Sequence, residues 1–119
     1  GKLSVHDKLR CCVDWHLEYM ESVDTSVWLE SAAYWLRHGP TRNRRDDWYA
    51  WLINQYALLI GQARPSLGPR ECQDRAYAIL TLVLGAWITH GRGSAIDNGA
   101  SVTEQRQLLI DTAMDIAAR

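Results

Sequence analysis

The chain has 119 residues, of which 47% are hydrophobic and 23% are charged, and its formal net charge is -1. This length and composition fit one globular domain with a hydrophobic core. The near-neutral charge gives no electrostatic basis for binding nucleic acid or an anionic membrane. The three cysteines have no regular spacing, and no signal peptide or lipid anchor pattern occurs. We therefore expect a reduced, cytoplasmic protein.

Apolar residues recur at helical spacing through the first part of the chain. Ser4 is suited to cap a first helix at about residues 5–22, because its hydroxyl can accept from an unpaired backbone N–H. Asp24 is suited to cap a second helix at about residues 25–38 in the same way. The Gly-Pro pair at residues 39–40 then predicts the end of that second helix.

A third helix is predicted at about residues 44–64. Asp46 and Asp47 would fall in its first turn, where negative charge is favoured by the helix dipole. Pro65 would end it, because proline lacks a backbone donor and clashes with the preceding turn. Tryptophan and leucine residues recur along this segment at helical spacing, which predicts one apolar face.

The most apolar stretch of the chain, residues 76–88, contains only Thr81 and Gly85 outside the strongly apolar and aromatic set. It is too long for a typical strand and too short to span a membrane. Pro69 suits the first position of the helix that contains it, predicted at about residues 69–90. A helix that is apolar on every face has to be buried on every face. We therefore expect its own chain to cover one side and a second copy to cover the other.

A glycine-rich loop at residues 91–100 precedes the last predicted helix, at about residues 102–118. Ser101 and Glu104 match the capping box that begins many helices. No segment has the alternating pattern and β-branched composition of a strand. We therefore predict an all-α fold of five helices in a single ligand-binding and dimerisation domain over residues 1–119.

Several segments together carry a resemblance to a known family. A W-L-x-x-x-A helix that starts at Trp28 precedes a basic turn at residues 42–45, and an amphipathic helix ends in Q-A-R at residues 62–64. The segment DRAYAILTLVLGAW, residues 74–87, then precedes the glycine-rich loop and an amphipathic helix. This order, over residues 4–118, resembles the C-terminal domain of TetR-family bacterial transcription regulators. It is most similar to the branch of the choline-responsive, BetI-type repressors.

The resemblance implies a repressor that binds operator DNA through an N-terminal helix-turn-helix head. This sequence contains no basic helix-turn-helix pattern, so we expect the head to be absent and the chain alone not to bind an operator. In the family, the last two long helices of each subunit pack with their symmetry mates into a four-helix bundle, which here implies a homodimer. The candidate interface residues are Leu80, Leu84, Trp87, Ile88, Leu109 and Ile116.

The chain has six Trp and five Tyr but no Phe. The resemblance implies that the helices carrying most of these rings enclose a pocket for a small-molecule effector. Indole and phenol rings suit flat aromatic or apolar ligands, and their negative faces also suit quaternary ammonium cations. A choline-like cation would use Glu30 as its counter-ion. The predicted pocket residues are Trp15, Tyr19, Trp28, Glu30, Trp35, Trp51, Asn54 and Tyr77.

Two other functions remain open at the level of sequence. The rings can instead fill a solid core, which would make the chain a structural dimerisation module without a pocket. An all-α enzyme would need carboxylates such as Asp14, Glu18 and Glu30 to meet in three dimensions, but no catalytic motif accompanies them. Cys12 and His16 lie one helical turn apart without further ligands for a metal site. We therefore predict no enzyme activity, no metal and no cofactor.

Overall fold

The computed structural model describes residues 3–90, 92 and 98–119, so most of the glycine-rich loop lies outside the described residues. The described part is all-helical, as predicted, and its one β-type contact is an isolated bridge between Asp24 and Arg92. None of the described helices has both the length and the hydropathy needed to cross a membrane. The helices are α1 (Val5–Glu21), α2 (Thr25–Arg37), α3 (Gly39–Ala63), α4 (Pro69–Thr89) and α5 (Val102–Ala118).

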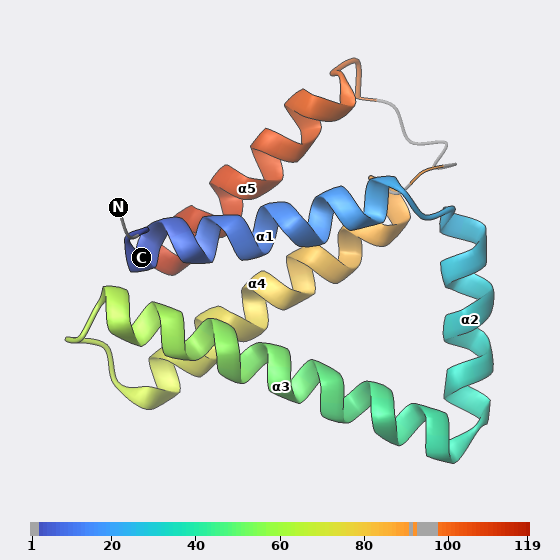
Figure 1. The fold of residues 1–119 in the computed structure, drawn as a ribbon, viewed down its shortest axis with the longest axis horizontal. Helices are drawn as coiled ribbons and strands as arrows, with labels where there is room; N and C mark the ends of the chain where they lie inside the picture. Colours follow the sequence, from blue (N-terminus) through green and yellow to red (C-terminus); the bar gives the residue numbers. More distant parts are fainter. Residues whose placement is uncertain (1–2, 91, 93–97) are drawn as a thin grey trace.

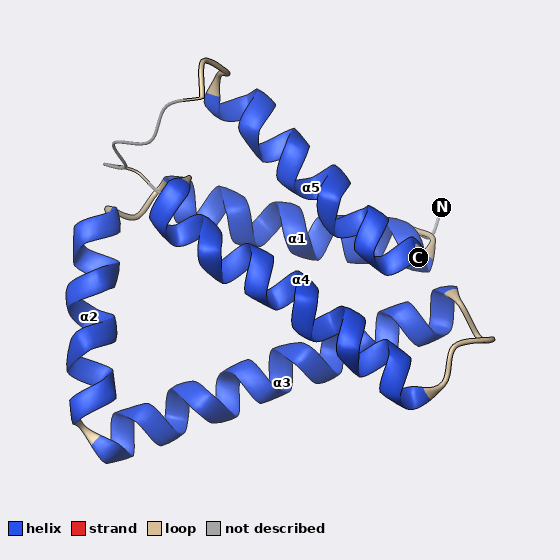
Figure 2. Ribbon diagram, turned by 180° about the vertical axis from the view of Figure 1, so that it is seen from behind, coloured by secondary structure: helices blue, strands red, loops and turns tan. Residues whose placement is uncertain are grey.

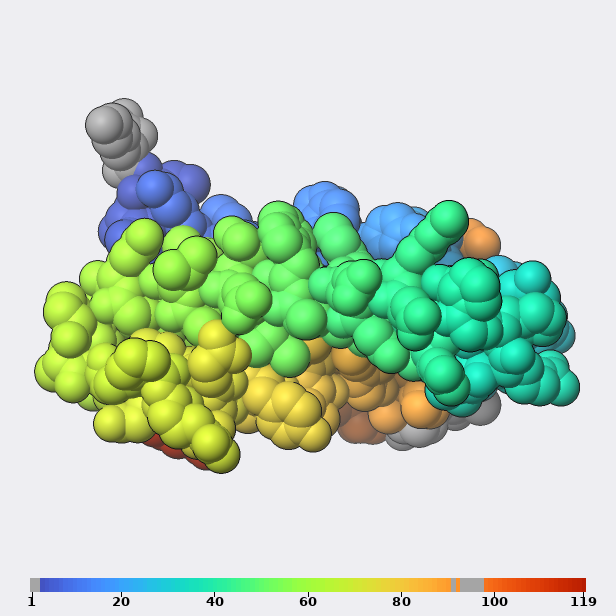
Figure 3. All heavy atoms as spheres, turned by 90° about the horizontal axis from the view of Figure 1, so that it is seen from below, coloured from blue at the N-terminus to red at the C-terminus, as the bar shows by residue number. Residues whose placement is uncertain are grey.

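The helices form two layers and a triangle. α1 and α3 lie on the side seen in Figure 1, and α4 and α5 lie on the opposite side, which faces the viewer in Figure 2. α2 joins the end of α1 to the start of α3 and closes a triangle with α3 and the α1–α4 pair. Figure 3 shows α3 running along one edge of the molecule, from α2 to the connection with α4.

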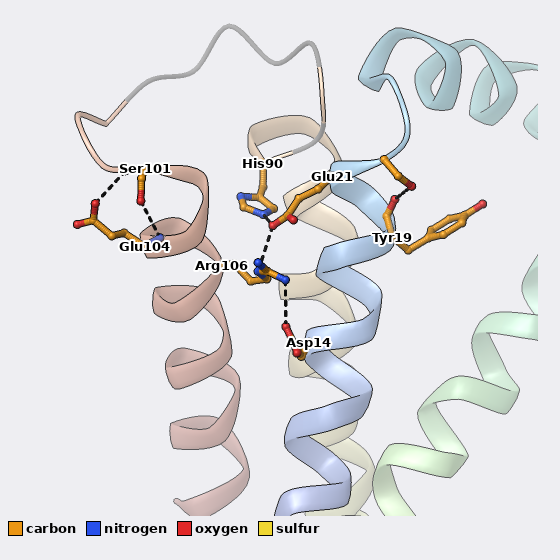
Figure 4. Close-up of polar contacts among 8 residues, drawn as sticks. Asp14, Tyr19, Glu21, His90, Ser101, Glu104 and Arg106 are labelled. Atoms are coloured by element: carbon orange, nitrogen blue, oxygen red, sulfur yellow. Dashed lines mark hydrogen bonds and ion pairs between the residues drawn. The ribbon is translucent and has the colours of Figure 1, made fainter.

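Local sequence signals set most helix ends. The Ser4 hydroxyl accepts from the backbone N–H of Asp7 at 3.0 Å and caps α1. At the start of α5, Ser101 and Glu104 form the predicted capping box, with donor–acceptor distances of 3.1 and 3.2 Å (Figure 4). Pro69 lies in the first turn of α4. Backbone N–H groups there have no hydrogen-bond partner within the helix, so the N–H that proline lacks is not needed.

α3 begins earlier than predicted. The Gly-Pro pair ends α2, as expected, but Gly39 and Pro40 also form the first turn of α3. Proline is compatible with this position because its fixed backbone angle matches the helix and its absent N–H is not needed there. The prediction that α3 begins near residue 44, with Asp46 and Asp47 in its first turn, is therefore wrong.

α4 is the centre of the core. Its buried side carries Ile79 and Val83, whose side chains are 0% and 1% exposed and belong to a cluster with residues of α1, α3 and α5. Its other side carries Thr81, Gly85 and Ile88, which are exposed in the single chain. Within the part of the chain that the structure describes, one side of the apolar helix is therefore buried and the opposite side is more exposed.

A polar network joins the ends of α1, α4 and α5 (Figure 4). His90 Nε2 lies 2.8 Å from a carboxylate oxygen of Glu21, and Arg106 Nε lies 3.3 Å from the same oxygen. A second nitrogen of Arg106 lies 3.6 Å from Asp14. These contacts fix α5 against α1 and α4 at the end of the molecule opposite the α3–α4 connection.

We predict that Ile79→Ala lowers the free energy of unfolding by about 2–5 kcal/mol, because truncating a fully buried side chain leaves a cavity. Leu58→Ala on α3 is the matched control, since Leu58 is 58% exposed and its truncation should change stability by less than about 0.5 kcal/mol. Urea denaturation followed by circular dichroism measures both. Similar losses in the two variants would contradict the assignment of α4 to the core.

Candidate functional site

A cavity of about 730 Å³ lies between α1, α2, α3 and α4. Its volume falls within the range of sites that bind small molecules, which are typically about 300–1,000 Å³. Four of the predicted pocket residues line it: Trp15 and Tyr19 from α1, and Trp28 and Trp35 from α2. We call this space the aromatic cavity.

One side of the aromatic cavity is a continuous set of rings from three helices. Trp15 and Tyr19, one turn apart on α1, stack with centroids 5.9 Å apart and planes inclined by 12°. Tyr19 meets the edge of Trp87 of α4 at 5.9 Å and 83°. Trp87 in turn stacks on Trp28 of α2 at 5.4 Å and 6°. We call these four rings the aromatic wall; it offers ring faces and edges to a flat or apolar ligand.

The opposite side of the cavity comes from the N-terminal half of α3. Thr41, Arg45, Trp48 and Leu52 recur every three to four residues and all line the cavity, together with Arg44. Sequence reasoning missed this stripe because it began the helix too late and interpreted residues 42–45 as a turn. The same spacing would have revealed it once the helix was started at the glycine before Pro40.

Two predicted pocket residues of α2 and α3 point elsewhere. Glu30 is exposed and does not line the aromatic cavity, because the cavity side of α2 is set by Trp28, Ser31 and Trp35 at three- and four-residue steps. Trp51 is also exposed, and it stacks on Trp48 at 5.1 Å from outside the cavity. The structure therefore does not place the proposed counter-ion of a choline-like ligand at this site.

The other two predicted pocket residues lie further away. Asn54 accepts a hydrogen bond from the amide of Gln73 at 2.9 Å, at a second hollow of about 590 Å³ between α3 and α4. Tyr77 is 64% exposed on the outer side of α4. Neither side chain lines the aromatic cavity.

The residues predicted for a dimer interface divide into two groups. Leu80 and Trp87 are only 4% and 8% exposed, and both line the aromatic cavity together with Leu84. These three residues therefore face the interior of their own chain. The remaining candidates lie toward the surface, with Ile88 exposed and Leu109 and Ile116 half-buried.

The charged residues that line the aromatic cavity are positive. Arg44 and Arg45 line it, and no Asp or Glu is among the described residues that do so. Arg45 is paired with Asp46 at 2.9 Å and lies 5.9 Å from the ring centroid of Tyr49. Burial raises the pKa of Tyr49, with the positive charge of Arg45 opposing, so the phenol stays neutral at physiological pH.

His16 joins the cavity wall to the core. Its Nδ1 lies 2.7 Å from the hydroxyl of Tyr56, a residue that is almost fully buried on α3. Burial lowers the pKa of His16 and raises the pKa of Tyr56, which favours the neutral form of both groups. A neutral imidazole nitrogen can accept a hydrogen bond from the phenolic O–H, so this pair holds α1 against α3 without a buried charge.

Comparisons of the chain with family models, with curated proteins and with solved structures find no match. Among the described residues, no group of three or more His, Cys, Asp or Glu side chains is placed to hold a metal ion.

We predict that the free energy of unfolding falls as the pH is lowered from about 7.5 to about 5.5. An unfolded histidine has a pKa near 6.5, whereas burial lowers the pKa of His16, so below that pH the unfolded chain binds more protons. His16→Gln should reduce this slope, and His6→Gln should not, because His6 is exposed. Urea denaturation at several pH values measures the slopes. An unchanged slope in His16→Gln would contradict the prediction.

Proposed function

We propose that this chain is the regulatory domain of a TetR-type transcription regulator, which binds a small effector in the aromatic cavity and dimerises. The observation that carries the proposal is the aromatic cavity itself, which four helices line with rings from every side of the triangle. A purely structural bundle would gain stability by filling this space with side chains, since native interiors are close-packed. The motif order from Trp28 to the last helix, with its resemblance to this family, adds independent support.

The proposed dimer would form through the exposed side of α4 and α5. Tyr77, Thr81 and Ile88 are exposed along α4, and on α5 Leu108 is exposed and Thr112, one turn later, is half-buried. We call this surface the outer face. It lies in the layer that Figure 2 presents to the viewer.

Two threonine hydroxyls of the outer face are already hydrogen-bonded within their own helices. The Thr81 hydroxyl donates to the carbonyl of Tyr77, and the Thr112 hydroxyl donates to the carbonyl of Leu108, both at 2.8 Å. These polar groups are therefore already satisfied within their own helices, and burying them against a second copy carries little desolvation penalty. Two helices of 21 and 17 residues also offer the length that a dimer interface of roughly 800 Å² per partner requires.

α4 provides a physical connection between effector and dimer. Its inner side supplies Leu80 and Trp87 to the aromatic cavity, and its outer side supplies Tyr77 and Ile88 to the outer face. A ligand that fits only one position of α4 would favour one arrangement of the two subunits. In the proposed parent regulator, that difference in affinity would couple effector binding to operator binding by separate helix-turn-helix heads.

We predict that a small effector raises the melting temperature, by roughly 10 °C at a concentration of about one hundred times its dissociation constant. A thermal-shift screen of small aromatic and quaternary ammonium compounds, choline included, tests this. Ser31→Trp should abolish the shift, because Ser31 lines the aromatic cavity and an indole there would fill it.

Ala33→Trp is the matched control for this screen, since Ala33 lies on the same helix but is exposed and does not line the cavity. It should keep the shift. If every compound leaves the melting temperature of the unmodified chain unchanged, the cavity has no regulatory role and a structural dimerisation module is the better assignment.

We also predict that light scattering gives the mass of two chains, and that Leu108→Glu reduces it to one. Leu108 is 58% exposed on the outer face, and a buried, unpaired carboxylate there would oppose dimerisation. Leu36→Glu on α2 introduces the same charge at an equally exposed leucine and should leave the dimer intact. A single-chain mass for the unmodified protein would remove the dimer from the proposal.

A further inference from the structure

We infer that the effector is an aromatic or apolar anion, such as a ring-bearing carboxylate, and not a cation. Its ring would lie on the aromatic wall, and its carboxylate would be bound by Arg44 and Arg45. This inference rests on the proposed function, because it assigns a ligand class to the aromatic cavity.

The charges that line the aromatic cavity carry the inference. Arg45 already has a partner in Asp46 at 2.9 Å, and its side chain is 20% exposed. Arg44 lines the same space from an exposed position and makes no ion pair with any other residue that the structure describes. The cavity side of α3 therefore presents one uncompensated positive charge beside one compensated charge.

The negative groups nearest in sequence do not reverse this balance. Asp46 and Asp47 are exposed and neither lines the cavity, and Glu30 of α2 is exposed outside it. A cation in the cavity would meet two guanidinium groups and no carboxylate from the described residues. The attraction of ring faces for a cation, about 0.5–2 kcal/mol, would have to overcome that repulsion.

Arginine also has the geometry that a carboxylate needs. Its planar guanidinium donates two parallel hydrogen bonds to the two oxygens, and such charge-assisted bonds are roughly twice as strong as neutral ones. Thr41 precedes Arg44 and Arg45 by about one helical turn, also lines the cavity and can donate from its hydroxyl. The start of α3 thus gathers three donors at the corner where α2 meets α3.

The spacing along α2 sets the length of the ligand. Trp28 belongs to the aromatic wall, and Trp35, near the corner with α3, is the last residue of α2 that lines the cavity. Seven residues of α-helix separate them by about 10 Å. A fused ring system with a directly attached or short-tethered carboxylate would span this distance.

Three probes that share the naphthalene ring system and differ in charge test the inference: naphthalene carboxylate, naphthalene carboxamide and naphthylmethyl trimethylammonium. Isothermal titration calorimetry should give the tightest binding for the carboxylate. Arg44→Gln should weaken carboxylate binding by about tenfold to a hundredfold, the loss expected for one charge-assisted hydrogen bond. The same variant should leave carboxamide affinity within about twofold. Arg42→Gln, two residues earlier on the same helix and outside the cavity, is the matched control and should change neither.

The outcomes separate the ligand class from the cavity itself. If the ammonium compound or the carboxamide binds at least as tightly as the carboxylate, the anion is wrong while the proposed effector cavity stands. If the carboxylate binds best but Arg44→Gln and Arg45→Gln do not weaken it, the assigned residues are wrong and the inference fails. If none of the three binds, both the inference and the proposed function are overturned. Circular dichroism spectra of the variants confirm that each remains folded.

Discussion

The structure depends on the packing of α4, which contacts each of the other four helices. Its buried side closes the core with Ile79 and Val83, and the same helix continues into the aromatic cavity with Leu80 and Trp87. Its remaining side is more exposed among the described residues, as at Thr81 and Gly85. A helix with one face in a core, one face lining a cavity and a third that is exposed is suited to connect a ligand to a second subunit.

The aromatic cavity exists because α2 stands away from the core. The residue of α2 that is fully buried is Thr25, at its start, where the hydroxyl donates to the carbonyl of Trp87 at 3.1 Å. From that anchor the helix runs to the far corner of the triangle, where it meets α3 (Figure 1). Five of the six tryptophans of the chain line the cavity between these helices, together with small side chains such as Ser31 and Thr41. The indole ring is the largest apolar side chain and reaches further from the backbone than they do.

The sequence predicts the helices better than it predicts the site. Helix caps depend on residues close together in the sequence, whereas the lining of the cavity depends on contacts between helices. Caps such as Ser101 with Glu104 act over a few residues and were predictable. The Gly-Pro pair at residues 39–40 was harder, because the same two residues end one helix and begin the next. Which rings line the cavity depends on the rotation of each helix against its neighbours. Trp48 and Trp51 lie three residues apart on the same helix. Trp48 lines the cavity, whereas Trp51 stacks on Trp48 from outside it.

The junction at the ends of α1, α4 and α5 gives the proposed coupling a short path. Trp87 belongs to the aromatic wall, and His90, one turn later on α4, is held by Glu21, which also binds Arg106 of α5. A ligand that repositions Trp87 therefore acts on a helix end that is bonded to Glu21 of α1, and Glu21 is in turn ion-paired with Arg106 of α5 (Figure 4). Packed interiors move between discrete arrangements and do not deform continuously. A small shift at the cavity would then change the relative position of α4 and α5, and with it the shape of the outer face on which the proposed dimer depends.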